Sequence, residues 1–167
     1  MNLIKVGPAG RPYGSVWEEK EKGELAKIFV FYDDTKIYSL QFLFIQNDNF
    51  VLSDIHGSPL QRMFTSVVLD YTSEFLTLVS GTCDDESFGL TSITFGTNKG
   101  TYGPYGSKKN SPYEKEIKLE IGKDRSFGGF HGTKTDNCIE SIGVYLKTVT
   151  STMIIPRRSQ SVGYTAW

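Results

Sequence analysis

Short runs of aromatic and β-branched residues recur along the chain, and clusters of Gly, Pro, Asn or Asp separate them. The runs with the clearest strand pattern cover residues 27–32, 39–45, 67–69, 75–79, 92–95, 117–121 and 142–146. No stretch keeps a helical 3.6-residue period through ten residues. Glu18 to Lys27 comes nearest, but its centre, Lys-Glu-Lys-Gly, has no apolar face, so we predict a turn or loop there. The pattern predicts an all-β domain of the sandwich, barrel or prism type.

One six-residue pattern, apolar-x-Ser-apolar-x-apolar, occurs three times. It covers Ile37 to Phe42, Leu90 to Phe95 and Ile139 to Val144. The serines, at positions 39, 92 and 141, are 53 and then 49 residues apart. Self-similarity at a nearly constant period indicates repeated structural units. We therefore expect three equivalent β-units.

Length and charge narrow the class of protein. At 167 residues, one hydrophobic core is the default, and 17 Gly, 11 Phe and 9 Tyr suit strands joined by tight turns. The formal charge of −1 provides no field that would steer nucleic acid or an anionic membrane to the protein. The first residues lack the apolar run of a signal peptide, and no run is long enough to span a bilayer. With two cysteines, we expect free thiols in the cytoplasm or nucleus.

The candidate reactive residues do not form a catalytic or metal-binding pattern. His56 and His131 have no third metal ligand at a recognisable spacing, and we interpret both as structural. Cys83 precedes Asp84, Asp85 and Glu86, whose charge disfavours a thiolate. Nucleophile-elbow and phosphate-binding motifs are absent from the sequence. We expect no catalytic residues, metal site or cofactor.

Four stretches, taken in order along the chain, resemble the plant jacalin-related lectins. The most specific is Phe95-Gly96-Thr97-Asn98-Lys99-Gly100-Thr101-Tyr102-Gly103-Pro104-Tyr105-Gly106, which is similar to the family's Thr-Asn-Lys followed by Tyr-Gly-Pro-Phe-Gly. The others are Val6-Gly7-Pro8 with Trp17-Glu18-Glu19, Asp70 to Gly81, and Gly128 to Gly132 followed by Ile139 to Leu146. The resemblance implies a β-prism I of three four-stranded antiparallel Greek-key sheets with pseudo-threefold symmetry. It places a lectin domain at 1–147 and a C-terminal extension at 148–167.

The resemblance also implies a sugar site between two loops. The family's Gly-Gly turn near the N-terminus falls on Tyr13-Gly14, and its Gly-x-x-x-Asp loop falls on Asp136 to Glu140. A sugar hydroxyl both donates and accepts, so it needs a carboxylate beside backbone N–H groups that glycine leaves accessible. The expected carbohydrate-binding residues are Gly14, Asp136, Asn137, Cys138 and Glu140.

Two departures from the family pattern leave other interpretations open. The loop's glycine is Asp136 here, and its carboxylate is the longer Glu140. We call the position of Glu140 within its repeat the slot. The slots of the first two repeats hold Tyr38 and Thr91, so Glu140 is the only carboxylate among the three. Glu140 can equally be a solvated residue at a strand entrance, Gly14 a turn glycine, and Asp136-Asn137 a tight turn. Three aromatic residues are candidates to stack on a sugar or to build the core: Tyr13, Tyr105 and Phe88.

Two functions from different classes follow from the resemblance. The first is a carbohydrate-binding protein of a plant, of the mannose type, with a mono- or oligosaccharide ligand and a homo-oligomeric state. The mannose branch is favoured because Met1 directly precedes the domain and nothing indicates a cut at Gly7. The second is a protein-interaction module whose sugar site has decayed, similar to plant proteins that restrict virus movement in defence. Neither function involves nucleic acid or a membrane.

Overall fold

The structure is a computed structural model that describes residues 2–20, 22–60, 63–86, 89–109 and 111–148. All regular elements of this part of the chain are β-strands. They are β1 (Leu3–Gly10), β2 (Ser15–Lys20), β3 (Glu24–Tyr32), β4 (Ile37–Gln46), β5 (Asn49–Leu52), β6 (His56–Gly57), β7 (Met63–Val68), β8 (Leu76–Asp84), β9 (Gly89–Thr97), β10 (Thr101–Gly106), β11 (Glu114–Glu120), β12 (Phe127–Lys134) and β13 (Ile139–Lys147). The extension at 149–167 lies outside the described residues.

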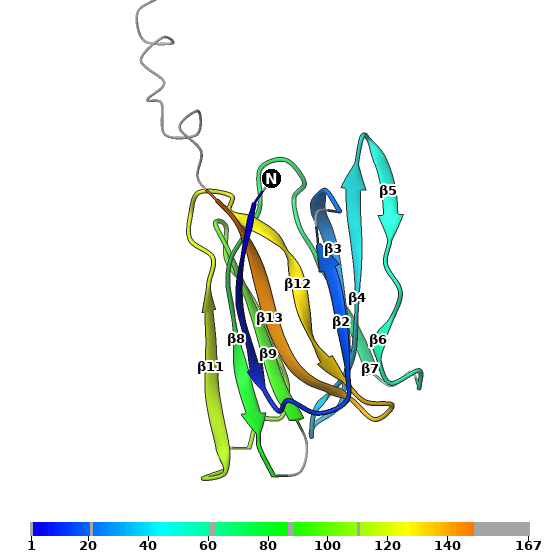
Figure 1. Cartoon of the computed structure of the whole chain (residues 1–167), viewed down its shortest axis with the longest axis vertical. Helices are drawn as coiled ribbons and strands as arrows, with labels where there is room; N and C mark the ends of the chain where they lie inside the picture. Colours follow the sequence, from blue (N-terminus) through cyan, green and yellow to red (C-terminus); the bar gives the residue numbers. More distant parts are fainter. Residues whose placement is uncertain (1, 21, 61–62, 87–88, 110, 149–167) are drawn as a thin grey trace, which may run out of the picture.

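The strands form three antiparallel sheets, numbered here by repeat (Figure 1). Sheet 1 has the order β5-β4-β3-β7, with β6 beside β4; sheet 2 has the order β10-β9-β8-β11; and sheet 3 has the order β1-β13-β12-β2. Sheet 3 thus joins the two ends of the domain, since β1 pairs with β13. Sheet 1 counts five strands rather than the predicted four because its edge strand is divided into β5 and β6.

The register of the three sheets confirms the repeat seen in the sequence. Each repeated serine lies opposite a glycine of the edge strand: Ser39 opposite Gly57, Ser92 opposite Gly106, and Ser141 opposite Gly10. Ser39, Ser92 and Ser141 are all buried. The short pattern therefore marks the same structural position three times.

The inward side chains of all three sheets form one core. Sheet 1 contributes Ile28 and Phe42, sheet 2 contributes Phe95, and sheet 3 contributes Phe130, each fully buried. The Phe42 and Phe130 rings stack with their centroids 4.5 Å apart, which ties sheet 1 to sheet 3. Burial of such side chains stabilises the fold by roughly 1.5–3 kcal/mol each.

The turn predicted at Glu18 to Lys27 is wrong. Most of this segment belongs to two strands, since β2 ends at Lys20 and β3 begins at Glu24. Within β2, Trp17 and Glu19 are buried while their neighbours are exposed, so the segment has the strand period of two. The strand pattern was missed because a charged residue, Glu19, occupies an inward position where an apolar residue is expected. Its carboxylate is accommodated by buried His56, whose Nε2 lies 2.8 Å from Oε1 of Glu19.

Candidate functional site

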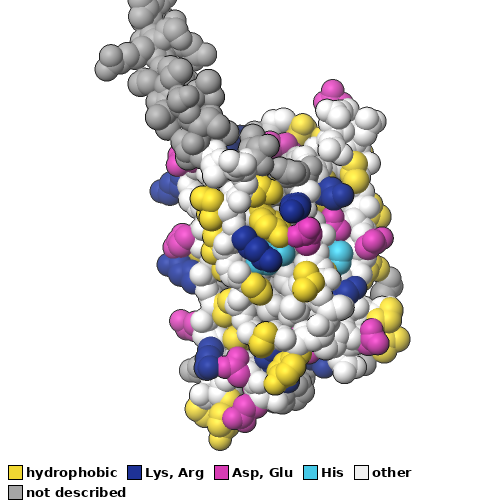
Figure 2. Space-filling view, in the orientation of Figure 1, with side chains coloured by type: hydrophobic (Ala, Val, Ile, Leu, Met, Phe, Trp, Pro, Cys, Tyr) yellow, Lys and Arg dark blue, Asp and Glu magenta, His cyan; other side chains and the backbone are white. Residues whose placement is uncertain are grey.

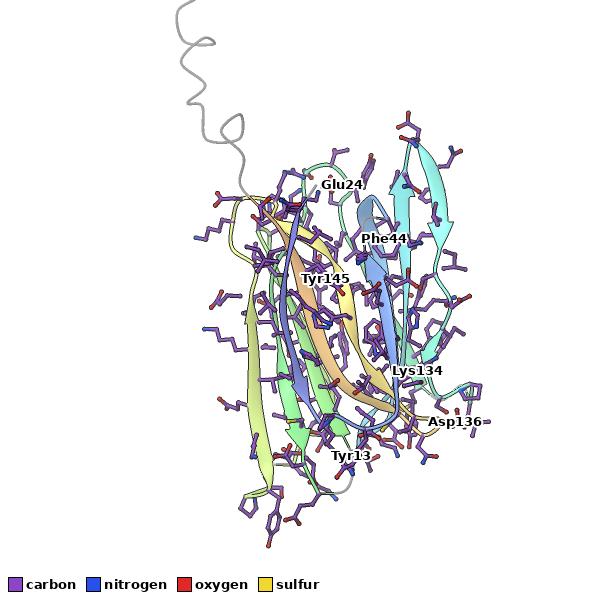
Figure 3. All side chains as sticks on the ribbon, viewed as in Figure 1. Tyr13, Glu24, Phe44, Lys134, Asp136 and Tyr145 are labelled. Atoms are coloured by element: carbon purple, nitrogen blue, oxygen red, sulfur yellow. The ribbon has the colours of Figure 1, made fainter. Side chains whose placement is uncertain are left out.

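The two loops predicted to form a sugar site lie at one end of the prism. Figure 3 shows Tyr13 and Asp136 at the end opposite Glu24, with Lys134 nearby. The β1–β2 connection supplies Tyr13 and Gly14, and the β12–β13 connection supplies residues 135–138. A hydrogen bond from the Thr135 N–H to the Cys138 carbonyl, at 3.0 Å, closes the second loop. The fold therefore brings together the loops that the sequence pattern selected.

Gly14 lies directly on the second loop. A Cβ atom added to it would overlap the carbonyl oxygen of Lys134, and it would also touch the Thr135 side chain. Its φ of 85° belongs to the left-handed region that favours glycine. The position therefore requires glycine for the close approach of the two loops.

The Glu140 side chain is turned into the protein rather than toward solvent. Its Oε1 accepts hydrogen bonds from the Thr135 hydroxyl at 3.2 Å and from the Cys138 thiol at 3.4 Å. Its Oε2 lies 3.8 Å from Nε of Arg11, and a Cβ added to Gly89 would come within 2.6 Å of it. Glu140 is therefore not a solvated residue at a strand entrance.

Arg11 and Glu140 form an ion pair whose facing atoms are not hydrogen-bonded. Nε of Arg11 and Oε2 of Glu140 are both buried and lack a hydrogen-bond partner in the described part of the protein. The Arg11 backbone is fixed, because its N–H donates to the Glu140 carbonyl at 2.9 Å and its carbonyl accepts from the Thr133 hydroxyl at 3.0 Å. One buried donor and one buried acceptor thus face each other at a spacing too long for a direct bond.

The remaining predicted residues divide between the surface and the interior. Asp136 and Asn137 are exposed at the tip of the loop, and Cys138 is buried. Burial, followed by the neighbouring Glu140 carboxylate, raises the pKa of the Cys138 thiol to about 11. Cys138 is therefore a neutral thiol at physiological pH, suited to donate to Glu140.

Sequence reasoning missed Arg11 and Thr135, which hold the carboxylate. The sequence could have pointed to Arg11, because Arg11 directly follows Gly10, the glycine that pairs with the repeated Ser141. The guanidinium of Arg11 lies 4.4 Å from the centre of the Tyr13 ring, and that ring is 55% exposed at the edge of the site. Tyr105 is instead partly buried and packs against Tyr32, with ring centroids 5.6 Å apart. Phe88 lies outside the described residues.

The slots of the other two repeats, which correspond to Glu140, hold hydroxyl groups instead of a carboxylate. Tyr38 is buried, and its hydroxyl donates to Oδ2 of Asp33 at 2.6 Å. Thr91 is buried, with its hydroxyl 2.7 Å from that of Thr82. The only carboxylate among these three slots is that of Glu140.

The two histidines interact within the protein. His56 stacks on Trp17 at 4.8 Å beside its Glu19 contact, and His131 has Nε2 2.9 Å from the Val6 carbonyl oxygen. Burial lowers the pKa of His131. Within the described ranges, His, Cys, Asp and Glu side chains form no group of three that could hold a metal ion. The same residues include no helix with the length and apolarity needed to cross a membrane.

A comparison with known protein families decides the assignment. The jacalin-like lectin domain matches residues 6–145, almost the whole described part of the chain. The chain belongs to the jacalin-like lectin family. Among its relatives, the Arabidopsis thaliana protein Jacalin-related lectin 2 is 34% identical over 158 residues, with 86% of each chain covered. Another, Protein RESTRICTED TEV MOVEMENT 1 of the same plant, is 33% identical over 156 residues, with 88% of each covered.

Solved structures of jacalin-family lectins share the fold. Artocarpin in complex with mannotriose matches with a TM-score of 0.74 and 29% identity, covering 89% of this chain and 99% of that one. Single-chain recombinant jacalin also has a TM-score of 0.74, with 27% identity and coverage of 89% and 96%. These matches confirm the predicted β-prism.

Proposed function

We propose that this jacalin-like lectin binds a carbohydrate of the mannose type at the loop end of the prism, between Gly14 and residues 136–140. One observation carries the proposal: buried Nε of Arg11 and Oε2 of Glu140 face each other 3.8 Å apart, and neither has a hydrogen-bond partner among the residues that the structure describes. A sugar hydroxyl can accept from the first and donate to the second, whereas an apolar group can do neither. Leaving such atoms unsatisfied costs about 1–3 kcal/mol each, so a ligand that bridges them gains that energy.

Binding at this pair requires a movement of Arg11. The two atoms are buried, but the Arg11 side chain is 18% exposed and rests on the exposed Tyr13 ring. An outward shift of the guanidinium would open the carboxylate while the loop backbone stays in place. Tyr13 then provides an aromatic surface beside the sugar, and Asp136 and Asn137 provide polar groups at the tip of the loop.

The mannose preference is part of the proposal. It is supported by the similarity to artocarpin, whose structures include complexes with mannotriose and methyl-α-mannose. A single shallow site of this kind has a Kd of about 1 mM, or roughly −4 kcal/mol. Useful affinity for a glycan surface then requires several sites in one assembly. We therefore propose a homo-oligomer as the active form.

The test is a titration of the full chain with mannose oligosaccharides and galactose, followed by NMR chemical shifts. Glu140→Gln keeps the size of the side chain but removes the charge, and we expect a 10- to 100-fold weaker Kd, the value of about one charge-assisted hydrogen bond. Arg11→Ala should weaken binding by a similar factor. Tyr38→Phe is the matched control, because it alters the equivalent slot of the first repeat and should leave the Kd unchanged. Absence of binding at tens of millimolar sugar would show that the proposal is wrong.

A second candidate is a protein-interaction module on a lectin scaffold, with a role in plant defence against viruses. The internal engagement of the Glu140 carboxylate by Thr135, Cys138 and Arg11 favours it, because a carboxylate used for packing no longer needs a sugar. The similarity to Protein RESTRICTED TEV MOVEMENT 1 also supports it. A chain shortened to residues 1–147 that keeps its melting temperature but loses its biological activity, in a protein that binds no sugar, would favour this candidate.

The cytoplasm or nucleus is our proposed location. Cys83 and Cys138 are both free and buried, as expected in a reducing compartment. Burial, followed by Asp85, raises the pKa of the Cys83 thiol, so both cysteines are stable as thiols. Fluorescent fusions of the full chain, imaged in plant cells, would test the location.

A further inference from the structure

A buried carboxylate occupies a position of sheet 3 where the other two sheets have an apolar side chain. In each sheet, the residue three positions before the partner of the repeated serine pairs with a residue of β7, β11 or β2. That residue is Val67 in sheet 1, Leu119 in sheet 2 and Glu19 in sheet 3. All three are buried. An apolar residue therefore satisfies the fold at this position, and the carboxylate of Glu19 is specific to the third repeat.

His56, which contacts this carboxylate, is also specific to one sheet. It pairs with the residue that follows the repeated serine, and the same position holds Tyr105 in sheet 2 and Ala9 in sheet 3. Nε2 of His56 lies 2.8 Å from Oε1 of Glu19, and its ring stacks on Trp17. Buried charged pairs can often be replaced by apolar residues of similar volume without loss of stability. The needs of the fold alone therefore do not account for the pair of Glu19 and His56.

The second oxygen of this carboxylate can accept a hydrogen bond from a ligand. Oε2 of Glu19 has no hydrogen-bond partner among the residues that the structure describes. Glu19 lines a cavity of about 180 Å³ between the end of β2 and the β4–β5 hairpin. The Glu19 side chain keeps 11% of its surface exposed, so it is not sealed from that cavity. Figure 2 shows acidic and basic side chains on the side of the molecule where β2 and β5 lie.

The cavity combines apolar walls with a net negative charge. Its apolar lining residues come from β4 and β5 and are Phe44, Val51 and Leu52. Its charged lining residues are Glu19, Asp54 and Lys22, two negative and one positive, so their formal charges sum to −1. Within the described ranges, Lys22 forms no ion pair with either carboxylate. The cavity therefore suits a ligand that has an apolar stem and one positive charge.

We propose that this cavity binds a primary alkylammonium group, carried either by a small aliphatic amine or by a lysine side chain of another protein. The ammonium donates to Oε2 of Glu19, and the alkyl stem packs against the apolar walls. At about 30 Å³ for each water, the cavity has the volume of about six waters, which suits a side chain rather than a drug-sized ligand. An arginine fork fits less well, because it needs both carboxylate oxygens and His56 already holds Oε1. A sugar ring would place most of its hydroxyls against apolar walls.

The first experiment is an NMR titration of the full chain with butylammonium chloride at constant pH. His56 and His131 are the two histidines of the chain, so their ring signals report on separate places. We expect the His56 signals to shift with a Kd of about 1–10 mM and the His131 signals to stay in place. Butanol is the matched probe without charge, and it should bind at least about 10-fold more weakly. Unmoved His56 signals at about 100 mM butylammonium, or equal affinity for butanol, would overturn the proposal.

Three variants test the role of the carboxylate. Glu19→Gln keeps the size of the side chain and removes its charge, so butylammonium should bind at least about 10-fold more weakly. Glu18→Gln, at the exposed neighbouring position, is the matched control and should leave the Kd unchanged. Lys22→Met removes the competing cation from the rim, so binding should tighten about 2- to 5-fold. If Glu19→Gln lowers the melting temperature too far to be tested, Lys22→Met decides, and unchanged or weaker binding by that variant would contradict the proposal.

The source of the ammonium can be determined with two further ligands. A blocked Gly-Gly-Lys-Gly-Gly peptide that binds more tightly than 1,4-diaminobutane would identify a protein lysine, and the reverse order would identify a free amine. Equal binding of the same peptide with an acetylated lysine side chain would contradict the proposal.

This cavity and the proposed glycan site are separate. Figure 3 shows Phe44 toward the Glu24 end of the prism, away from Tyr13 and Asp136. Glu140→Gln should therefore leave the Kd for butylammonium unchanged. Methyl-α-mannoside that shifts the His56 signals where butylammonium does not would show that the cavity is a sugar site and that the inference is wrong. Binding of butylammonium by a protein that binds no sugar would refute the proposed function and leave this inference standing.

Discussion

The loops at 33–38 and 135–140 occupy equivalent places in the first and third repeats, and they differ in the direction of one hydrogen bond. Both close with an N–H to carbonyl bond across four residues, at 3.2 Å from Asp33 to Lys36 and 3.0 Å from Thr135 to Cys138. In the first loop the slot residue, Tyr38, donates to the loop's first residue, Asp33. In the third loop the first residue, Thr135, donates to the slot residue, Glu140.

The difference separates what the fold requires from what the site requires. In both loops the slot residue is held by its backbone, because Ser58 N–H donates to the Tyr38 carbonyl and Arg11 N–H donates to the Glu140 carbonyl, each at 2.9 Å. The same backbone hydrogen bond therefore forms with two different side chains in the slot. The first loop completes its hydrogen bonding internally, and the third leaves a buried carboxylate oxygen facing Arg11. That oxygen is the reason why we propose the third loop as the binding site.

The largest effect should come from Gly14→Ala. The third loop needs a residue without a Cβ at this position, because that atom would overlap the Lys134 carbonyl oxygen. With φ at 85°, we expect a loss of about 2–4 kcal/mol in the free energy of unfolding, measured in urea. Gly100→Ala is the matched control, since nothing lies within 4 Å of its added Cβ, and it should stay within about 0.5 kcal/mol. Equal losses at the two glycines would show that the loops do not press on each other.

A smaller, pH-dependent effect is expected for Asp33→Asn. Burial opposes ionisation of Asp33, but hydrogen bonds from Thr35, Tyr38 and the Lys36 N–H hold its pKa at about 2, below the ordinary 3.8. A lowered folded-state pKa stabilises the fold in full above pH 4, and this stabilisation is lost as the pH falls through 2. The shift corresponds to about 1–2 kcal/mol after allowance for partial exposure. Wild type and variant should differ by this amount at pH 7 and converge near pH 2.

The control for this prediction is Asp34→Asn, at the exposed neighbouring position. Denaturant unfolding at pH 2, 4 and 7 should give the same curve for Asp34→Asn as for the wild type at every pH. If Asp33→Asn behaves in the same way, the first loop is not held together by its carboxylate, and its contrast with the third loop disappears.

The sequence predicted the architecture well because the repeated serine reports a backbone position. Ser39, Ser92 and Ser141 lie opposite edge-strand glycines, so a six-residue pattern marked three sheets. It failed at β2, where the inward residue is Glu19. A carboxylate at a core position looks like a loop residue until its partner His56, 37 residues away, is known.

The residues of the candidate site were predicted from the resemblance, but their geometry was not. Glu140 and Gly14 were selected because they fall on the family's Gly-x-x-x-Asp loop and Gly-Gly turn. The sequence did not reveal that the Glu140 side chain points inward, because Arg11 and Thr135 reach it from other positions through the fold. Nor did it reveal that Cys138 donates to that carboxylate, a contact that depends on loop geometry.

The smallest effect, and the finest test of the comparison, is expected from Asp136→Gly. Asp136 and Asp34 are both exposed residues at the second position of their loops, so their removal should change stability by less than about 0.5 kcal/mol. Of these two loops, the third has behind it a buried carboxylate oxygen that lacks a hydrogen-bond partner among the described residues. Removing the Asp136 side chain clears one negative charge from the entrance to that carboxylate, so mannose oligosaccharides should bind about 3- to 5-fold more tightly, under 1 kcal/mol. Asp34→Gly should leave the Kd unchanged, since Tyr38 and Asp33 satisfy each other. A tighter Kd for both variants would mean that the glycan senses the overall charge of this end of the prism, and that the two loops are not functionally distinct.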